Sequence, residues 1–97
     1  MFSIKKIEIP NSNRFFIKLN YGYRILSVST ENNIPFITVM NDTGNGQTSV
    51  GFFRLIENNI ILEPQYMKYI DSFQVLDSNR DTIVYFLFVY NMLEEDL

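Results

Sequence analysis

Apolar and polar side chains alternate along most of this chain, and short groups of turn-forming residues separate the alternating stretches. In RFFIKLN and YRILSVST the apolar residues are mostly β-branched or aromatic. A period of two places successive side chains on opposite faces of a β-strand. The intervening NSN, YG, ENN and DSNRD contain residues that favour turns. We therefore expect an all-β chain with strands near 2–9, 14–20, 23–30, 34–41, 49–56, 60–63, 66–76 and 82–90.

The connections between these expected strands are short, so neighbouring strands should pair antiparallel. This predicts a small antiparallel β-sandwich or partly open barrel of about seven or eight short strands. A short helix at 64–70 is the alternative for that segment, because Pro64 is acceptable in a first helical turn. The 97 residues suffice for one core. We expect a single domain, 1–97, that ends in an acidic tail at 93–97.

The stretch TIVYFLFVY, residues 82–90, is apolar on both of its faces. A strand that left one such face bare would invite edge pairing and aggregation. Other parts of the chain or another subunit must therefore cover it, and we expect a homo-oligomer. The two faces carry Ile83, Tyr85, Leu87 and Val89 on one side, and Val84, Phe86, Phe88 and Tyr90 on the other.

The chain has no cysteine and no histidine. Disulfides, thiolate or imidazole metal sites, and Cys or His catalysis are therefore excluded. Asp71, Asp77 and Asp81 could form a metal cluster, but two of them flank a turn in which Asp bonds the backbone. No spacing organises carboxylates, hydroxyls or lysine into a catalytic set. We expect no catalytic residue, metal or cofactor, and hence not an enzyme.

The net charge of −3 comes from the tail, where Glu94, Glu95 and Asp96 supply the acidic excess. A neutral body argues against duplex nucleic acid as a partner, because binding it requires a basic face. The segment 82–90 is far shorter than the roughly 20 residues of a membrane helix, and MFSIKKIEIP contains no uninterrupted apolar run. We expect a soluble, cytosolic protein.

The glycine-rich stretch NDTGNGQTS, residues 41–49, could be a ligand loop or only a connector. It is not a P-loop, because Gln47 follows Gly46 where that motif needs lysine, and another strand follows. One interpretation is a flexible hairpin connection between strands 34–41 and 49–56. The other is a mobile lid whose backbone N–H groups close over an anion together with Thr43, Thr48 and Ser49.

Arginine, lysine and tyrosine are the remaining candidates for binding a ligand. Alternation places Arg54 on the same face as Phe52 and Ile56, either as an edge residue reaching solvent or as an anchor for a carboxylate or phosphate. Tyrosines combined with cations can hold a base and a phosphate, although they also pack ordinary sheets. The candidates are Arg24, Arg54 and Lys68 for phosphate, and Tyr66 and Tyr69 for stacking.

The series YGYRILSVSTENNIPFITVMND, FFRL, YIDSF and TIVYFLF resembles a small uncharacterised domain family of tailed-phage genomes, over residues 14–88. Thr38 stands where that family tends to have Trp, and Phe86 stands where it has His, so a site that uses those two residues does not carry over. Asp71 and Ser72 also replace its Gly-Thr. Arg54 transfers as a possible polar contact. The resemblance implies a phage or prophage origin and a role in the host cytoplasm during infection.

Two classes of function are expected from these features. The first is a non-enzymatic counter-defence protein that sequesters a small anionic signal, such as a cyclic nucleotide, in an oligomer. The alternative is an inhibitor or adaptor that docks a host protein through strand 82–90 or the acidic tail, with a minor virion component as a further possibility.

Overall fold

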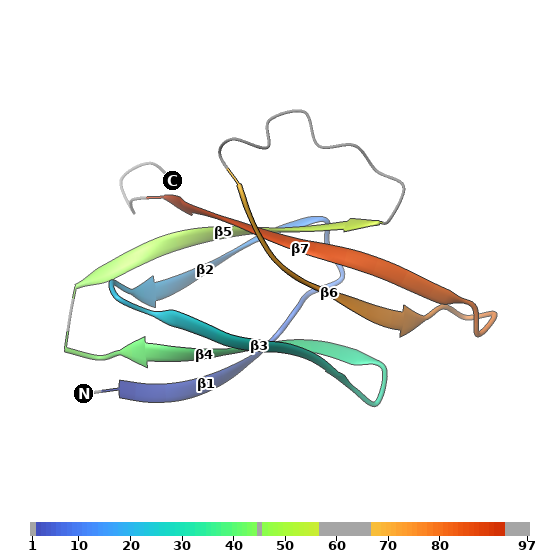
Figure 1. The fold of residues 1–97 in the computed structure, drawn as a ribbon, viewed down its shortest axis with the longest axis horizontal. Helices are drawn as coiled ribbons and strands as arrows, with labels where there is room; N and C mark the ends of the chain where they lie inside the picture. Colours follow the sequence, from blue (N-terminus) through green and yellow to red (C-terminus); the bar gives the residue numbers. More distant parts are fainter. Residues whose placement is uncertain (1, 45, 57–66, 93–97) are drawn as a thin grey trace.

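The protein is all-β, as the alternation predicts. The computed structural model describes residues 2–44, 46–56 and 67–92, with the backbone alone described at 47–49, 53, 56 and 90–92. Within them it has seven strands and no helix (Figure 1). The strands are β1 Phe2–Glu8, β2 Arg14–Asn20, β3 Arg24–Glu31, β4 Ile34–Asp42, β5 Gln47–Ile56, β6 Lys68–Leu76 and β7 Thr82–Met92.

The bounds of these seven strands agree with the expected ones to within two residues at every end. The predicted strand 60–63 and the first residue of 66–76 lie outside the described residues, and Met67 precedes β6 without belonging to a strand. The helix considered for 64–70 is wrong for 68–70, because those residues form the start of β6 and pair with β7.

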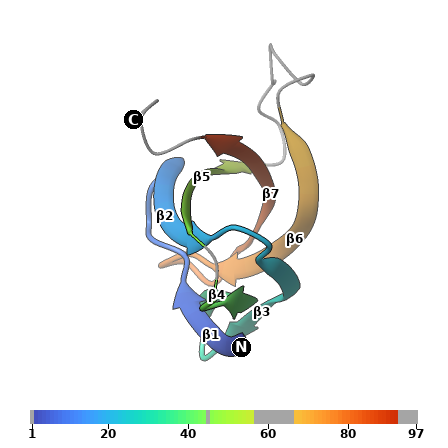
Figure 2. The same cartoon turned by 90° about the vertical axis from the view of Figure 1, so that its left-hand side faces the viewer.

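The strands form two antiparallel sheets. Sheet A has the order β1-β4-β3, and sheet B has the order β2-β5-β7-β6. The expected pairing of consecutive strands is found for β3 with β4 and for β6 with β7, whereas β1 pairs with β4 and β2 with β5 across longer stretches of chain. Sheet B curls, and sheet A lies across its open side (Figure 2). The sheets do not close into a barrel.

The core lies between the concave face of sheet B and the facing side of sheet A. Alternate residues supply it, as period-two burial requires. Phe15 stacks on Phe52 with ring centroids 5.4 Å apart, and Phe73 stacks on Tyr85 at 5.3 Å. The buried apolar residues are Ile9, Phe15, Leu19, Ile37, Val39, Val50, Phe52, Phe73, Tyr85, Leu87 and Val89.

Asparagine side chains link the two sheets at their corners. At one corner the Asn20 backbone N–H donates to Asn41 Oδ1 (2.9 Å), and Asn20 Nδ2 donates to the Asp42 carbonyl (2.6 Å). At another, Asn33 bonds the backbone of Leu76 through both its donor and its acceptor. The links satisfy backbone groups that neither sheet's own ladder pairs.

The turns follow the local chemistry of the sequence. Asn32 and Asn33 have φ values of 51° and 64°, as the two-residue turn of a type I′ hairpin requires. In the β6–β7 turn, Asp77 Oδ1 accepts hydrogen bonds from the backbone N–H groups of Asn79 (2.8 Å) and Asp81 (2.9 Å). The role expected of Asp at that turn is confirmed.

Candidate functional site

The structure distributes the candidate ligand residues over separate places. Arg24 is exposed on sheet A, where it pairs with Met40. Arg54 lies on the concave face of sheet B. Lys68 and Tyr69 lie at the start of β6. Tyr66 lies outside the described residues. Of the predicted set, only Lys68 and Tyr69 are therefore brought together in one exposed place.

The glycine-rich stretch is a shorter connection than the sequence suggests. β4 extends to Asp42 and β5 begins at Gln47, so the backbones of Thr48 and Ser49 are in β5 and pair with Leu19 and Lys18 of β2. Thr43 remains in the connection. The hairpin interpretation is wrong, because β4 and β5 belong to different sheets and the segment crosses between them.

This crossing connection is anchored on both sides. The Gly44 N–H donates to Asp42 Oδ1 (3.0 Å), an arrangement typical of Asp before a turn. The Tyr21 N–H donates to the Gly46 carbonyl (2.7 Å). Since Thr48 and Ser49 belong to a paired strand, the set of lid donors expected from the sequence does not lie on one loop.

Arg54 is a buried arginine, 8% exposed, on an inner strand of sheet B. The interpretation of Arg54 as an edge residue reaching solvent is therefore wrong. Its guanidinium Cζ lies 4.5 Å from the centre of the Tyr85 ring, a cation–π distance. Its Nη2 donates to Asn11 Oδ1 at 2.9 Å. A ring face and an amide oxygen thus stabilise the guanidinium.

The Nε of Arg54 is buried and makes no hydrogen bond within the described residues. A buried donor without a partner costs free energy. Asn11, which is exposed, lies at the solvent end of the guanidinium. The contacts of Arg54 hold the segment between β1 and β2 against sheet B, which is a structural role.

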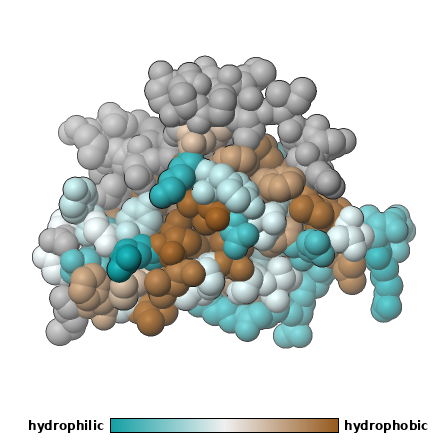
Figure 3. Space-filling model, viewed as in Figure 1, coloured by the Kyte–Doolittle hydropathy of each residue, from teal (hydrophilic) through white to brown (hydrophobic). Residues whose placement is uncertain are grey.

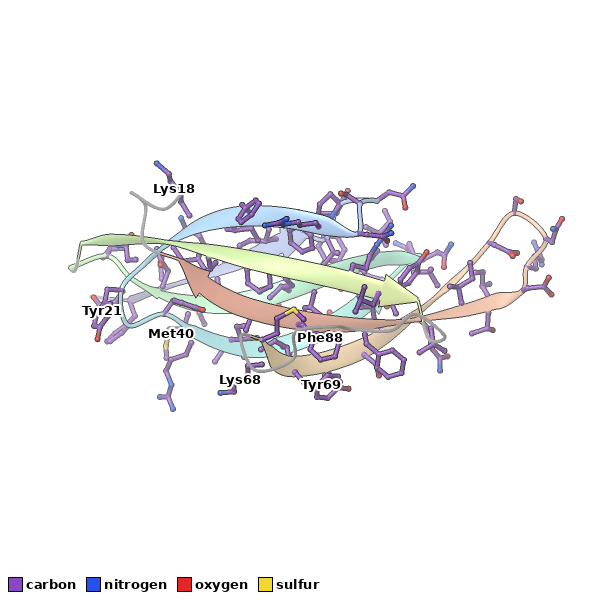
Figure 4. All side chains as sticks on the ribbon, turned by 90° about the horizontal axis from the view of Figure 1, so that it is seen from above. Lys18, Tyr21, Met40, Lys68, Tyr69 and Phe88 are labelled. Carbon is purple, nitrogen blue, oxygen red and sulfur yellow. The ribbon has the colours of Figure 1, made fainter. Side chains whose placement is uncertain are left out.

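An aromatic cluster lies on the convex face of sheet B. Tyr69 of β6 is 50% exposed, and its ring makes an edge contact with Phe88 of β7 at 5.6 Å and a tilted contact with Phe86 at 6.4 Å. We call Tyr69, Phe86 and Phe88 the aromatic platform. Lys68 is exposed beside Tyr69, and Figure 4 shows both side chains projecting from the same edge of the sheet, next to Phe88.

The aromatic platform covers part of the convex face of β7, the apolar face that does not point into the core. Val84, Phe86 and Phe88 are only partly buried, whereas Tyr85, Leu87 and Val89 on the other face are buried in the core. Tyr69 covers part of Phe86 and Phe88. From the side on which β3 and β6 lie in front, apolar side chains gather over the middle of the molecule (Figure 3). Exposed Leu26 and Leu76 lie on these two strands.

No family model, curated protein or solved structure matches this chain. The described residues hold no helix that could cross a membrane. Asp71 does not join Asp77 in a common cluster; its carboxylate accepts the N–H of Ser72 at 2.8 Å. Within the described part of the chain, no three acidic side chains are grouped to hold a metal ion.

Sequence reasoning did not identify Asn11 or Phe88 as site residues. Asn11 meets Arg54 from 43 positions earlier in the chain, and no local pattern signals that contact. Phe86 and Phe88 were recognised only as an apolar strand face. Their place in the aromatic platform depends on strand pairing, because Tyr69 becomes their neighbour only when β6 pairs with β7.

Proposed function

We propose that this protein is a non-enzymatic binding protein that holds a small nucleotide-type anion on the aromatic platform. The observation that carries the proposal is the half-exposed ring of Tyr69, supported by Phe88 and Phe86 and adjacent to the exposed Lys68. A base offers a π-face to an aromatic ring, and a phosphate attracts an ammonium group.

Support by neighbouring rings favours stacking, because an aromatic side chain that is already held loses less conformational entropy when a base settles on it. The register pairs Lys68 with Val89 and Tyr69 with Phe88, so the two side chains leave opposite faces of β6. Because β6 is an edge strand and Lys68 is exposed, its flexible stem can reach around the edge and bring the ammonium to a phosphate attached to the stacked base. Arg54 does not take part in this proposal, since it is buried on the opposite face of the sheet.

Sequestration is consistent with the chemistry of the platform, which offers stacking surface and a cation. The counter-defence role, the host cytoplasm and the phage origin rest on the resemblance to the phage domain family and form part of the proposal. Assembly into a homo-oligomer is likewise proposed, on a surface other than the aromatic platform, which the ligand occupies.

The proposal is tested by melting the purified protein with a panel of mononucleotides, cyclic nucleotides and inorganic phosphate. A ligand present at 100 times its Kd adds about 2.7 kcal/mol of stability, a shift of several degrees for a chain of this size. The shift should be absent in Tyr69→Ala. It should persist in Tyr21→Ala, which removes a tyrosine that is 72% exposed in the β2–β3 turn.

Flat melts across the panel would contradict the proposal and favour the alternative of a protein partner. A shift that Tyr69→Ala retains in full would place the ligand elsewhere. Light scattering after size-exclusion chromatography tests the oligomer separately, since a monomer of 11.5 kDa at micromolar concentration would refute it.

A further inference from the structure

The opposite edge of the convex face of sheet B also combines an aromatic ring with cations. Phe16 of β2 is 43% exposed, and the guanidinium Cζ of Arg14 lies 5.3 Å from its ring centre. Lys18, two residues further along β2, is exposed. Figure 4 places Lys18 across the sheet from Lys68. The platform is therefore one end of a longer surface.

The strand register connects the two ends. Arg14 pairs with Phe53 of β5, Phe53 pairs with Phe88 of β7, and Phe88 pairs with Tyr69 of β6. These four positions form one row across the sheet. Three strand spacings separate its ends, about 14 Å along the surface. A mononucleotide stacked on Tyr69 would leave most of this row unused.

We infer that the convex face of sheet B binds single-stranded nucleic acid, with bases stacking on Tyr69 and Phe88 near β6 and on Phe16 near β2. This inference rests on the proposed function and extends the ligand from a single nucleotide to a short strand. Aromatic rings on a β-sheet that receive successive unpaired bases are an established mode of single-strand recognition.

The charges on sheet B favour a negatively charged nucleic acid strand as the ligand. The four strands of sheet B carry the exposed cations Arg14, Lys18 and Lys68, and within the same strands the acidic residue is Asp71. Arg14 and Lys18 share the convex face with Phe16, and Lys68 lies at the edge strand next to Tyr69, so cations are present at both ends of the path that a sugar–phosphate backbone would take across the sheet. A second copy docked on this face would bring like charges together, which is unfavourable.

A duplex fits this surface less well than a single strand. Paired bases are stacked within the helix and cannot settle on protein rings. Three phosphate contacts are also few for duplex binding, which depends mainly on charge. With three contacts to a single strand, the affinity should fall about 20-fold between 50 and 200 mM salt.

The test is fluorescence anisotropy with 5′-labelled single-stranded oligonucleotides of graded length, beside calorimetry with the matching mononucleotide. Affinity should rise with length until the sheet is covered, and a duplex of equal length should bind more weakly. Phe16→Ala should weaken the longer oligonucleotides by about 5- to 150-fold and leave the mononucleotide unchanged. Tyr69→Ala should weaken both ligands.

Phe2→Ala is the matched control, because Phe2 is 58% exposed on β1 of the other sheet and should not affect either ligand. The pair Arg14→Gln and Lys18→Gln gives a second readout that removes no ring, and it should reduce the salt dependence. The melting temperature of each variant, measured without ligand, verifies that it is folded.

The outcomes separate this inference from the proposed function. If mononucleotides bind through Tyr69 but oligonucleotides bind no better and Phe16→Ala changes nothing, the inference is overturned and the proposed function stands. If neither ligand binds, both are overturned. If light scattering shows a dimer that Phe16→Ala dissociates, and oligonucleotides do not bind, the face is an interface between copies of this chain and the inference is overturned.

Discussion

Asn33 forms two hydrogen bonds with the backbone of Leu76, and so its side chain occupies the place of a neighbouring strand. Its Nδ2 donates to the Leu76 carbonyl at 2.9 Å, and its Oδ1 accepts from the Leu76 N–H at 2.7 Å. The same residue has a φ of 64° in the β3–β4 turn. Asn33 thus has two roles: it adopts the left-handed conformation that the turn needs, and it forms the hydrogen bonds of the backbone groups at the end of β6 on the other sheet.

Replacing Asn33 by glycine should separate these two roles, because glycine keeps the left-handed conformation and loses both hydrogen bonds. We expect a loss of about 1 to 2 kcal/mol in the free energy of unfolding by urea. Asn32→Gly is the control, since Asn32 has a φ of 51° in the same turn. Equal stabilities of the two variants would show that the link to Leu76 contributes nothing.

Arg54→Met should change the free energy of unfolding by no more than about 1 kcal/mol in either direction. The variant loses the contacts with Tyr85 and Asn11, but it also removes a buried charge whose Nε lacks a partner. In the original chain Asn11→Ala should cost about 1 kcal/mol, and in the Arg54→Met background it should cost almost nothing. A loss of 3 kcal/mol or more for Arg54→Met, or equal effects of Asn11→Ala in both backgrounds, would contradict this account.

Leu87→Ala should destabilise the fold by about 2 to 5 kcal/mol, because the side chain of Leu87 is fully buried between the sheets. Val84→Ala, on the convex face of the same strand, should cost about 1 kcal/mol or less, since Val84 is partly exposed. Urea unfolding of both variants measures the difference. Similar losses would indicate that the faces of β7 are assigned wrongly, as a slip of one residue in the register would cause.

Stability should depend on Tyr23 at high pH. Burial raises the pKa of Tyr23 above its usual value near 10. Because the folded-state pKa lies above the unfolded-state value, the contribution of Tyr23 is fully present below about pH 10 and is lost as pH rises through the folded-state pKa. Tyr23→Phe should therefore show a shallower loss of stability above pH 10 in urea unfolding at a series of pH values. If stability falls with pH as steeply in Tyr23→Phe as in the original chain, Tyr23 makes no such contribution.

The sequence predicts the strands well because burial with a period of two is a local property. Strand β2 was expected at 14–20 and is found at Arg14–Asn20. The choice of partners is not local. Nothing in β2 shows that it pairs with β5 and not with β3, because alternation determines which side chains share a face and leaves the neighbouring strand open. For the same reason, the crossing between β4 and β5 was interpreted as a hairpin.

The candidate site was predictable only where its residues are adjacent in sequence. Lys68 and Tyr69 were chosen by residue type, as a cation and as a tyrosine, and they lie together because they are neighbours in the chain. Phe88 becomes part of the site through the pairing of β6 with β7, and Asn11 reaches Arg54 across the fold. Arg24 was grouped with these residues by type, and the topology puts it on the other sheet.

An NMR titration tests most directly whether the aromatic platform binds a nucleotide. The isotope-labelled protein is titrated with the mononucleotide that raises its melting temperature most. We predict that the amide shifts change most at Lys68, Tyr69, Phe86 and Phe88, and that Tyr69→Ala abolishes the changes. Shifts that concentrate instead at Asn11 and Arg54, or that spread weakly over the whole chain, would contradict this prediction.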